Sequence, residues 1–124
     1  MNDKRPVNLD LSTIKFPVTA IASITHRVTG VAIFLALPIL LWMLDRSLAS
    51  PESFADLKEL MTSPLVKLVV WAILAVLLYH LVAGIRHLVM DAGVGETLEG
   101  GQRGAKLGFI ISVVLILLVG GWIW

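Results

Sequence analysis

LVVWAILAVLLYHLVAGI, residues 68–85, decides the fold class of this chain. The stretch lies between Lys67 and Arg86 and contains one ionisable residue, His80. An α-helix needs about 20 predominantly apolar residues to cross the ~30 Å hydrocarbon core of a bilayer, and this stretch is close to that length. We therefore predict a membrane-spanning helix that carries an imidazole inside the membrane.

Two further apolar runs, residues 28–44 and 107–124, contain no ionisable group at all. Of the 124 residues, 57% are hydrophobic and 15% are charged. A soluble domain has about 45–50% apolar and about 25% charged residues. The composition therefore predicts an all-α membrane protein with a single domain over residues 1–124. We place its transmembrane helices at roughly 24–46, 64–89 and 105–124.

The composition also excludes several classes of function. The formal net charge is +1, which gives no basis for binding nucleic acid. The chain has no cysteine, so it forms no disulfide and supplies no thiolate to a metal or to an iron–sulfur cluster.

Basic residues predict the topology. In a protein with three spans, the N-terminal segment and the second connection share one side of the membrane. That side carries Lys4, Arg5, Lys15, Arg27, Arg86, Arg103 and Lys106, whereas the other side carries Arg46, Lys58 and Lys67. The positive-inside rule then places the N-terminus in the cytoplasm. The interfacial residues Trp42, Trp71, Trp122 and Trp124 should all lie near the outer face.

The two connections differ in character. The first contains SFADLKELM, residues 53–61, which has the pattern of a short amphipathic helix. The second contains GVGETLEGGQR, residues 93–103, for which we predict a glycine-rich loop.

The second span carries a polar face. His80, Gly84, His87 and Asp91 are spaced i, i+4, i+7 and i+11, which aligns them on one side of a helix. If the inner membrane surface lies near Met90, His80 is ~15 Å deeper. An ionisable group at such depth usually faces a partner, a cavity or a cofactor. Three roles stay open for it: a neutral histidine bonded to a neighbouring helix, an axial ligand of haem, and a proton relay.

A haem bound at His80 would need a ligand from another chain. His87 is seven residues away on the same helix, ~10.5 Å along its axis, and so cannot reach the opposite face of the iron. His26 is expected at the inner rim, well above His80. The sequence thus links the haem hypothesis to a partner subunit.

A second polar cluster lies at the start of the first span. Ser23, Arg27 and Gly30 are spaced i, i+4 and i+7, and His26 flanks them. We expect this cluster and Asp91 to meet in one pocket at the inner rim, where Arg27 could pair with Asp91. Hydroxyl and guanidinium donors there would suit the carbonyl oxygens of a quinone. The alternatives are an arginine that snorkels to the lipid headgroups and a serine that caps the helix.

Two segments carry a family resemblance. RPVNLDLSTIKFPVTAIASITHRVTG, residues 5–30, and HLVAGIRHLVMD, residues 80–91, closely resemble the cytochrome b membrane anchors of succinate dehydrogenase, respiratory complex II. The patterns S-x-x-H-R-x-[ST]-G and H-x-x-x-G-x-R-H-x-x-x-D are both intact, and the resemblance extends over essentially the whole chain.

The resemblance implies roles for individual residues. His80 would be one axial ligand of a haem b shared with the second membrane anchor subunit, which would supply the other ligand. Ser23 and Arg27 would bind ubiquinone, with Asp91 close to the same pocket. The surroundings of the haem propionates would include His26, Arg27 and His87.

The resemblance also implies an assembly. The anchor would pack with the second anchor into a helical bundle in the lipid of the bacterial inner membrane, its C-terminus periplasmic. An FAD flavoprotein subunit and an iron–sulfur subunit would oxidise succinate and pass electrons to ubiquinone, so this chain alone would catalyse nothing. The remaining alternatives are a fumarate reductase anchor, a small proton-conducting or transport protein, and a purely structural anchor.

Overall fold

The computed structural model describes residues 6–124, and this part of the chain contains four α-helices and no strand. The helices are α1 (Val18–Ala49), α2 (Pro51–Leu60), α3 (Pro64–Asp91) and α4 (Leu98–Ile123). Three of them, α1, α3 and α4, are long and apolar enough to cross a membrane. The predicted all-α membrane fold is therefore confirmed. Lys4 and Arg5, which the topology prediction counts, lie outside the described residues.

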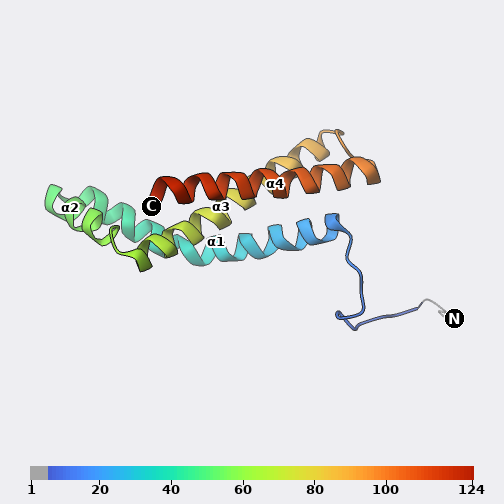
Figure 1. Cartoon of the computed structure of the whole chain (residues 1–124), viewed down its shortest axis with the longest axis horizontal. Coiled ribbons are helices and arrows are strands. Elements are labelled where there is room, and N and C mark those ends of the chain that lie inside the picture. Colours follow the sequence, from blue (N-terminus) through green and yellow to red (C-terminus); the bar gives the residue numbers. More distant parts are fainter. Residues whose placement is uncertain (1–5) are drawn as a thin grey trace.

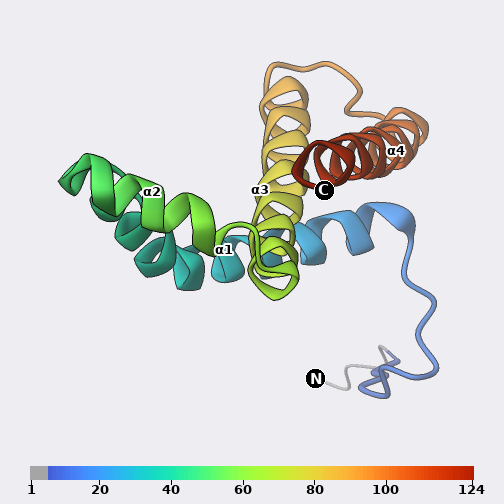
Figure 2. The same ribbon diagram turned by 60° about the vertical axis from the view of Figure 1, so that its left-hand side comes forward.

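The three long helices run in alternating directions (Figure 1). The start of α1 and the α3–α4 connection lie at one end of the molecule, which we call the inner end after the predicted topology. The short helix α2 and the C-terminus lie at the opposite end, which we call the outer end. The long helices are inclined to one another rather than parallel, and α1 crosses α3 (Figure 2).

Small residues form the contacts between the long helices. Membrane helices associate through close packing and interhelical hydrogen bonds, which small side chains permit. Tyr79 of α3 is the exception in size: its hydroxyl donates a 3.0 Å hydrogen bond to the carbonyl oxygen of Ala22, and its ring stacks on Phe109 at 5.5 Å between centroids. Tyr79 therefore ties α3 to both other spans. The buried residues are Ala22, Thr29, Ala36, Tyr79, Ala83, Gly101, Ala105 and Ser112.

The first span begins earlier than its hydropathy predicts. α1 starts at Val18, immediately after Pro17, whereas the apolar run predicts a start near residue 24. Ahead of it, the Asp10 carboxylate accepts hydrogen bonds from the Ser12 hydroxyl and backbone N–H at 2.6 and 3.0 Å. These bonds lower the pKa of Asp10.

The predicted amphipathic helix of the first connection is present as α2. Ser50 caps it by accepting a 3.0 Å hydrogen bond from the backbone N–H of Ser53, and Pro51 occupies the first helical turn, where proline is favoured.

The prediction of a glycine-rich loop over residues 93–103 is wrong for its second half, because α4 begins at Leu98. The Thr97 hydroxyl caps this helix by accepting a 3.0 Å hydrogen bond from the N–H of Gly100. An i, i+4 ion pair between Glu99 and Arg103, at 2.6 Å, supports the first turns. The glycine-rich composition of this segment favours a loop, and the helix start that Thr97 marks was therefore missed.

Trp71 fastens α3 to α4 at the outer end. Its indole N–H donates to the carbonyl oxygen of Ile116 at 2.9 Å, and its ring meets that of Trp124 edge-on at 6.0 Å between centroids. Gly120 lies directly against the indole: a Cβ built on it would be 2.9 Å from Cε2 of Trp71. Two of the four tryptophans thus pack on one another at this end.

We expect Gly120→Ala to destabilise the protein by about 1–3 kcal/mol, the usual cost of overpacking a fixed neighbour. The indole cannot move aside without breaking its bond to Ile116. Gly121→Ala is the matched control, because a Cβ on Gly121 meets nothing within 4 Å. The measurement is the thermal midpoint of the purified protein in detergent, and equal midpoints for the two variants would contradict the packing described.

Candidate functional site

Three imidazoles meet where α1 crosses α3. The rings of His26, from α1, and His80, from α3, are stacked with centroids 4.2 Å apart and 14° between their planes. The ring of His87, also from α3, lies 5.1 Å from that of His26. His80 and His87 thus face the same neighbour, as their spacing on one helical face predicts.

Two glycines make room for this cluster. A Cβ on Gly30 of α1 would lie 3.2 Å from Cε1 of His80, and a Cβ on Gly84 of α3 would lie 3.7 Å from Nε2 of His26. Each helix therefore presents bare backbone to an imidazole of the other. The ring of His26 occupies the room that Gly84 leaves beside His80.

Hydrogen bonds fix the tautomer of His80 in its neutral form. Its Nδ1 lies 3.1 Å from the carbonyl oxygen of His26 and 3.1 Å from the hydroxyl oxygen of Thr29. The Thr29 hydroxyl itself donates to that carbonyl at 2.8 Å. Since a carbonyl oxygen only accepts, the proton of the neutral ring is on Nδ1. Nε2 therefore keeps a lone pair, the state in which histidine binds a metal.

The histidines line a groove of about 450 Å³ on the side of the molecule. The lining residues are His26, His80, Leu81, Gly84, Ile85, His87 and Leu88. The three aliphatic side chains among them are more than half exposed, at 55%, 53% and 68%. The groove is therefore an open, largely apolar surface, and a bound molecule would be enclosed only if a second body covered it.

The expected position of His26, at the inner rim well above His80, is wrong. His26 lies at the same level as His80, with its ring flat against the ring of His80. The reason is the early start of α1 at Val18, which places His26 about two turns inside the helix. Its Nε2 is buried and has no hydrogen-bond partner among the described residues.

The predicted pocket of Ser23, Arg27 and Asp91 is not formed within this chain. No ion pair joins Arg27 to Asp91, and both residues are exposed in the described structure. Arg27 follows His26 directly, so it points about 100° away from the face that contacts α3. Asp91 lies a full turn beyond His87, near the level where Thr19 and Met90 flank Gly101. Arg27 therefore faces outward on α1, and Ser23, one turn before it, is half-buried.

Two further residues support the site region. Thr29 orients His80; it had no predicted role beyond the serine-or-threonine position of the first pattern. Arg86 donates from Nη2 to the carbonyl oxygen of Gly101 at 3.0 Å, and its buried Nε has no partner among the described residues. Gly104 lies against it, since a Cβ there would be 3.3 Å from that Nε. Arg86 thus joins α3 to the inner end of α4.

The three histidines do not form a metal site by themselves. Within residues 6–124, no group of three or more His, Cys, Asp or Glu side chains could hold a metal ion. The rings of His26 and His80 are stacked, so their nitrogen atoms do not converge on a common metal position. A metal at His80 would therefore take one ligand from this chain and the others from elsewhere.

Comparison with known proteins gives consistent results. Residues 1–119 match the model of the family described as succinate dehydrogenase/fumarate reductase transmembrane subunit. The succinate dehydrogenase cytochrome b556 subunit of Coxiella burnetii is 47% identical, with both chains covered completely. The subunit of the same name from Paracoccus denitrificans is 34% identical over 92% of this chain and 88% of the relative. The cytochrome b560 subunit of Reclinomonas americana is 36% identical over 80% and 72%.

Proposed function

The chain belongs to the family of succinate dehydrogenase/fumarate reductase transmembrane subunits, and from this premise we propose that it binds one face of a haem b through His80 and helps to form a quinone-reducing site. It is a multi-pass membrane subunit of a larger complex. The single observation that carries the proposal is the position of the His80 ring, whose Nδ1 lies 3.1 Å from the carbonyl oxygen of His26 and from the hydroxyl of Thr29 on α1, so that Nε2 is left for a metal.

The groove around His80 suits a haem in two respects. Its aliphatic wall matches an apolar macrocycle, and Nε2 of His80 would supply one ligand to the iron. Beside it, the buried and unpaired Nε2 of His26 suits a polar substituent such as a propionate. His87, on the inner side of the same groove, belongs to the same surroundings.

The second axial ligand must come from another subunit. His26 cannot supply it, because its ring lies flat against that of His80 and not across a metal from it. His87 projects from the same helix as His80. The open groove also needs a cover, and we propose that the second membrane anchor provides both the cover and the ligand.

A bound haem b accepts and releases one electron at a time. His80 would hold it in place, and the hydrogen bonds of Nδ1 with His26 and Thr29 would fix the imidazole plane and raise the basicity of Nε2 as a ligand. The low-polarity wall of Leu81, Ile85 and Leu88 would exclude water from this face once a partner covers it.

We place the quinone on the outward side of α1 near the inner end. Ser23 and Arg27 are one turn apart there, and neither makes a side-chain hydrogen bond within the described chain. Both remain free to donate to the carbonyl oxygens of a ubiquinone headgroup, and Arg27 would stabilise negative charge on the reduced ring. Asp91 is separate from them, so we assign it to the water-exposed margin and not to the headgroup contact.

The partners follow from this arrangement. Electrons for the quinone would come from succinate through an FAD flavoprotein subunit and an iron–sulfur subunit docked at the inner end. In a bacterium this end would face the cytoplasm, in agreement with its basic residues.

The proposal is tested by a reduced-minus-oxidised visible spectrum of the complex that co-purifies with this chain. We expect a b-type band on reduction with dithionite, together with flavin and iron–sulfur signals. A complex with no haem band and no flavin would overturn the assignment.

Gly30→Ala should disturb this site while His80 itself stays in place. Its Cβ would press on Cε1 of His80 at 3.2 Å, and the ring cannot tilt freely because Nδ1 is held. We expect about a tenfold loss of haem affinity, as is usual when the support of a metal ligand is disturbed. The measurement is the haem-to-flavin ratio of the purified complex. Gly108→Ala is the control, since its Cβ would meet only Val82 at an ordinary 3.9 Å; equal ratios in both variants would refute the expectation.

A further inference from the structure

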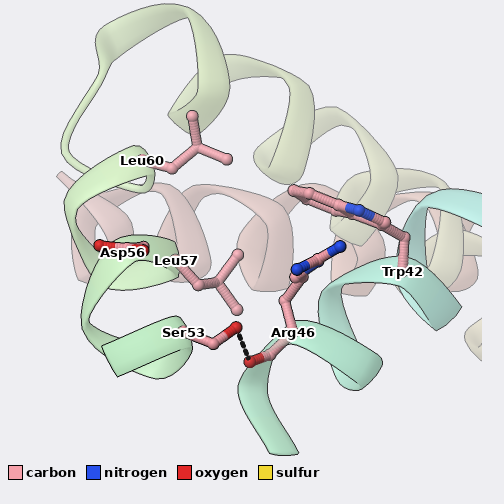
Figure 3. Close-up of a pocket in the computed structure, with 6 residues that line it drawn as sticks. All are labelled: Trp42, Arg46, Ser53, Asp56, Leu57 and Leu60. Atoms are coloured by element: carbon pink, nitrogen blue, oxygen red, sulfur yellow. Dashed lines mark hydrogen bonds between the residues drawn. The ribbon is translucent and has the colours of Figure 1, made fainter. Parts of the chain in front are cut away.

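The outer end contains a cavity that the haem and quinone proposals do not use. It lies between the end of α1 and α2, has a volume of about 330 Å³, and is lined by Trp42, Arg46, Ser53, Asp56, Leu57 and Leu60 (Figure 3). The Ser53 hydroxyl donates to the carbonyl oxygen of Arg46 at 2.7 Å, which fastens α2 against the last turn of α1. Both walls of the cavity are therefore fixed.

A second cavity of about 200 Å³ adjoins the first. Trp42, Leu57 and Leu60 line both of them, so the two spaces share one wall. The remaining lining of the second cavity consists only of aliphatic and methionine side chains from α1, α3 and the α2–α3 connection, such as Ile39, Met43 and Val66. The first cavity is thus partly polar, and the adjoining one is entirely apolar.

The first cavity carries opposite charges that do not neutralise each other. Arg46 and Asp56 both line the cavity, yet no ion pair joins them and neither side chain makes a hydrogen bond within the part of the chain that the structure describes. The guanidinium lies below the Trp42 indole, whereas Asp56 lies across the cavity on α2 (Figure 3). The pattern offers one site for an anion and one for a cation.

The cavity also lies at a suitable depth. Arg46 is in the last turn of a span, and tryptophans such as Trp42 concentrate at the level of the lipid headgroups. A molecule bound here would meet charged groups at the interface and apolar walls toward the membrane interior.

We propose that the outer end binds one zwitterionic phospholipid, with its phosphate at Arg46, its amine at Asp56 and part of an acyl chain in the apolar cavity. A guanidinium binds phosphate oxygens through charge-assisted hydrogen bonds. The apolar compartment selects a lipid over a soluble phosphate. By filling the space between α1, α2 and α3, the lipid would hold the short helix in position.

The test measures dioleoylphosphatidylethanolamine retained by the purified, delipidated complex after the lipid is added back, by native mass spectrometry. We expect Arg46→Gln to weaken retention about tenfold, the usual effect of losing a charge-assisted bond. Leu60→Trp, which fills the shared wall and keeps both charges, should also lose the lipid. Lys58→Gln is the matched control, because it removes a charge from an exposed position of α2 that lines neither cavity.

Headgroup choice tests the amine contact separately. Wild type should prefer dioleoylphosphatidylethanolamine to dioleoylphosphatidylglycerol, and Asp56→Asn should abolish that preference. Retention unchanged in both Arg46→Gln and Leu60→Trp would overturn the proposal, because the lipid would then be bound elsewhere on the complex. Equal binding of the two lipids by wild type would refute the contact with Asp56. The haem band should stay constant in every variant, so failure here is distinguishable from failure of the haem assignment.

Discussion

Replacing His80 with alanine should remove the b-type absorption of the complex, or convert it to the spectrum of a haem with one axial ligand fewer. The groove offers the iron no substitute ligand. In the wild type, the ring of His26 lies flat against the ring of His80, and His87 lies further along α3. The measurement is the reduced-minus-oxidised spectrum, normalised to covalently or tightly bound flavin in the same sample.

His87→Ala is the matched control for this experiment, since it removes an imidazole from the same groove and leaves His80 bonded to α1. It should retain the band. If His80→Ala prevents assembly, His80→Gly with added imidazole tests the same point, because free imidazole can occupy the emptied space and restore the band. An unchanged spectrum in His80→Ala would rule out the ligand assignment.

The histidine face of α3 was predictable because it depends only on helical periodicity. His80, Gly84 and His87 lie on one side of any regular helix, and the apolar stretch around them is long enough to span a membrane. The three spans follow from the same local signal. Neither conclusion requires knowledge of the neighbouring helices.

The level of His26 was not predictable from the same signals. Hydropathy underestimates the length of α1 because Ser23, Thr25, His26 and Arg27 interrupt the apolar run, although the helix continues through them from Val18. The register between α1 and α3 depends on where a glycine of one helix admits a side chain of the other, here at Gly30 and Gly84. This register is a property of the pair of helices, and the sequence of one helix alone does not predict it.

The same limit explains the missing contact between Arg27 and Asp91. Each residue was placed near the inner end, but membrane depth alone does not fix the direction in which a side chain points. Once His26 faces α3, Arg27 must face outward, because successive residues of a helix differ by about 100°. The exposed position changes the function expected of Arg27, because it leaves the guanidinium available to a molecule outside this chain.

Arg27→Ala should therefore lower the rate of quinone reduction by succinate about 100-fold, the scale found when a donor to a developing negative charge is removed. Succinate oxidation with a soluble dye as acceptor should stay near wild type, because the dye takes electrons before they reach the membrane. Ser23→Ala should act in the same direction but about tenfold, since a neutral hydroxyl is a weaker donor.

Arg103→Ala separates this role from a general loss of charge at the inner end. Arg103 is also exposed there and, among residues 6–124, pairs only with Glu99 on its own helix, so its removal should leave both activities intact. Neither Ser23 nor Arg27 bonds to another helix of the described chain, so their substitution should spare the fold. Loss of both activities in equal proportion would mean that Arg27 supports docking of the soluble subunits and does not contact the quinone. A selective loss of quinone reduction would place the headgroup on the outward face of α1.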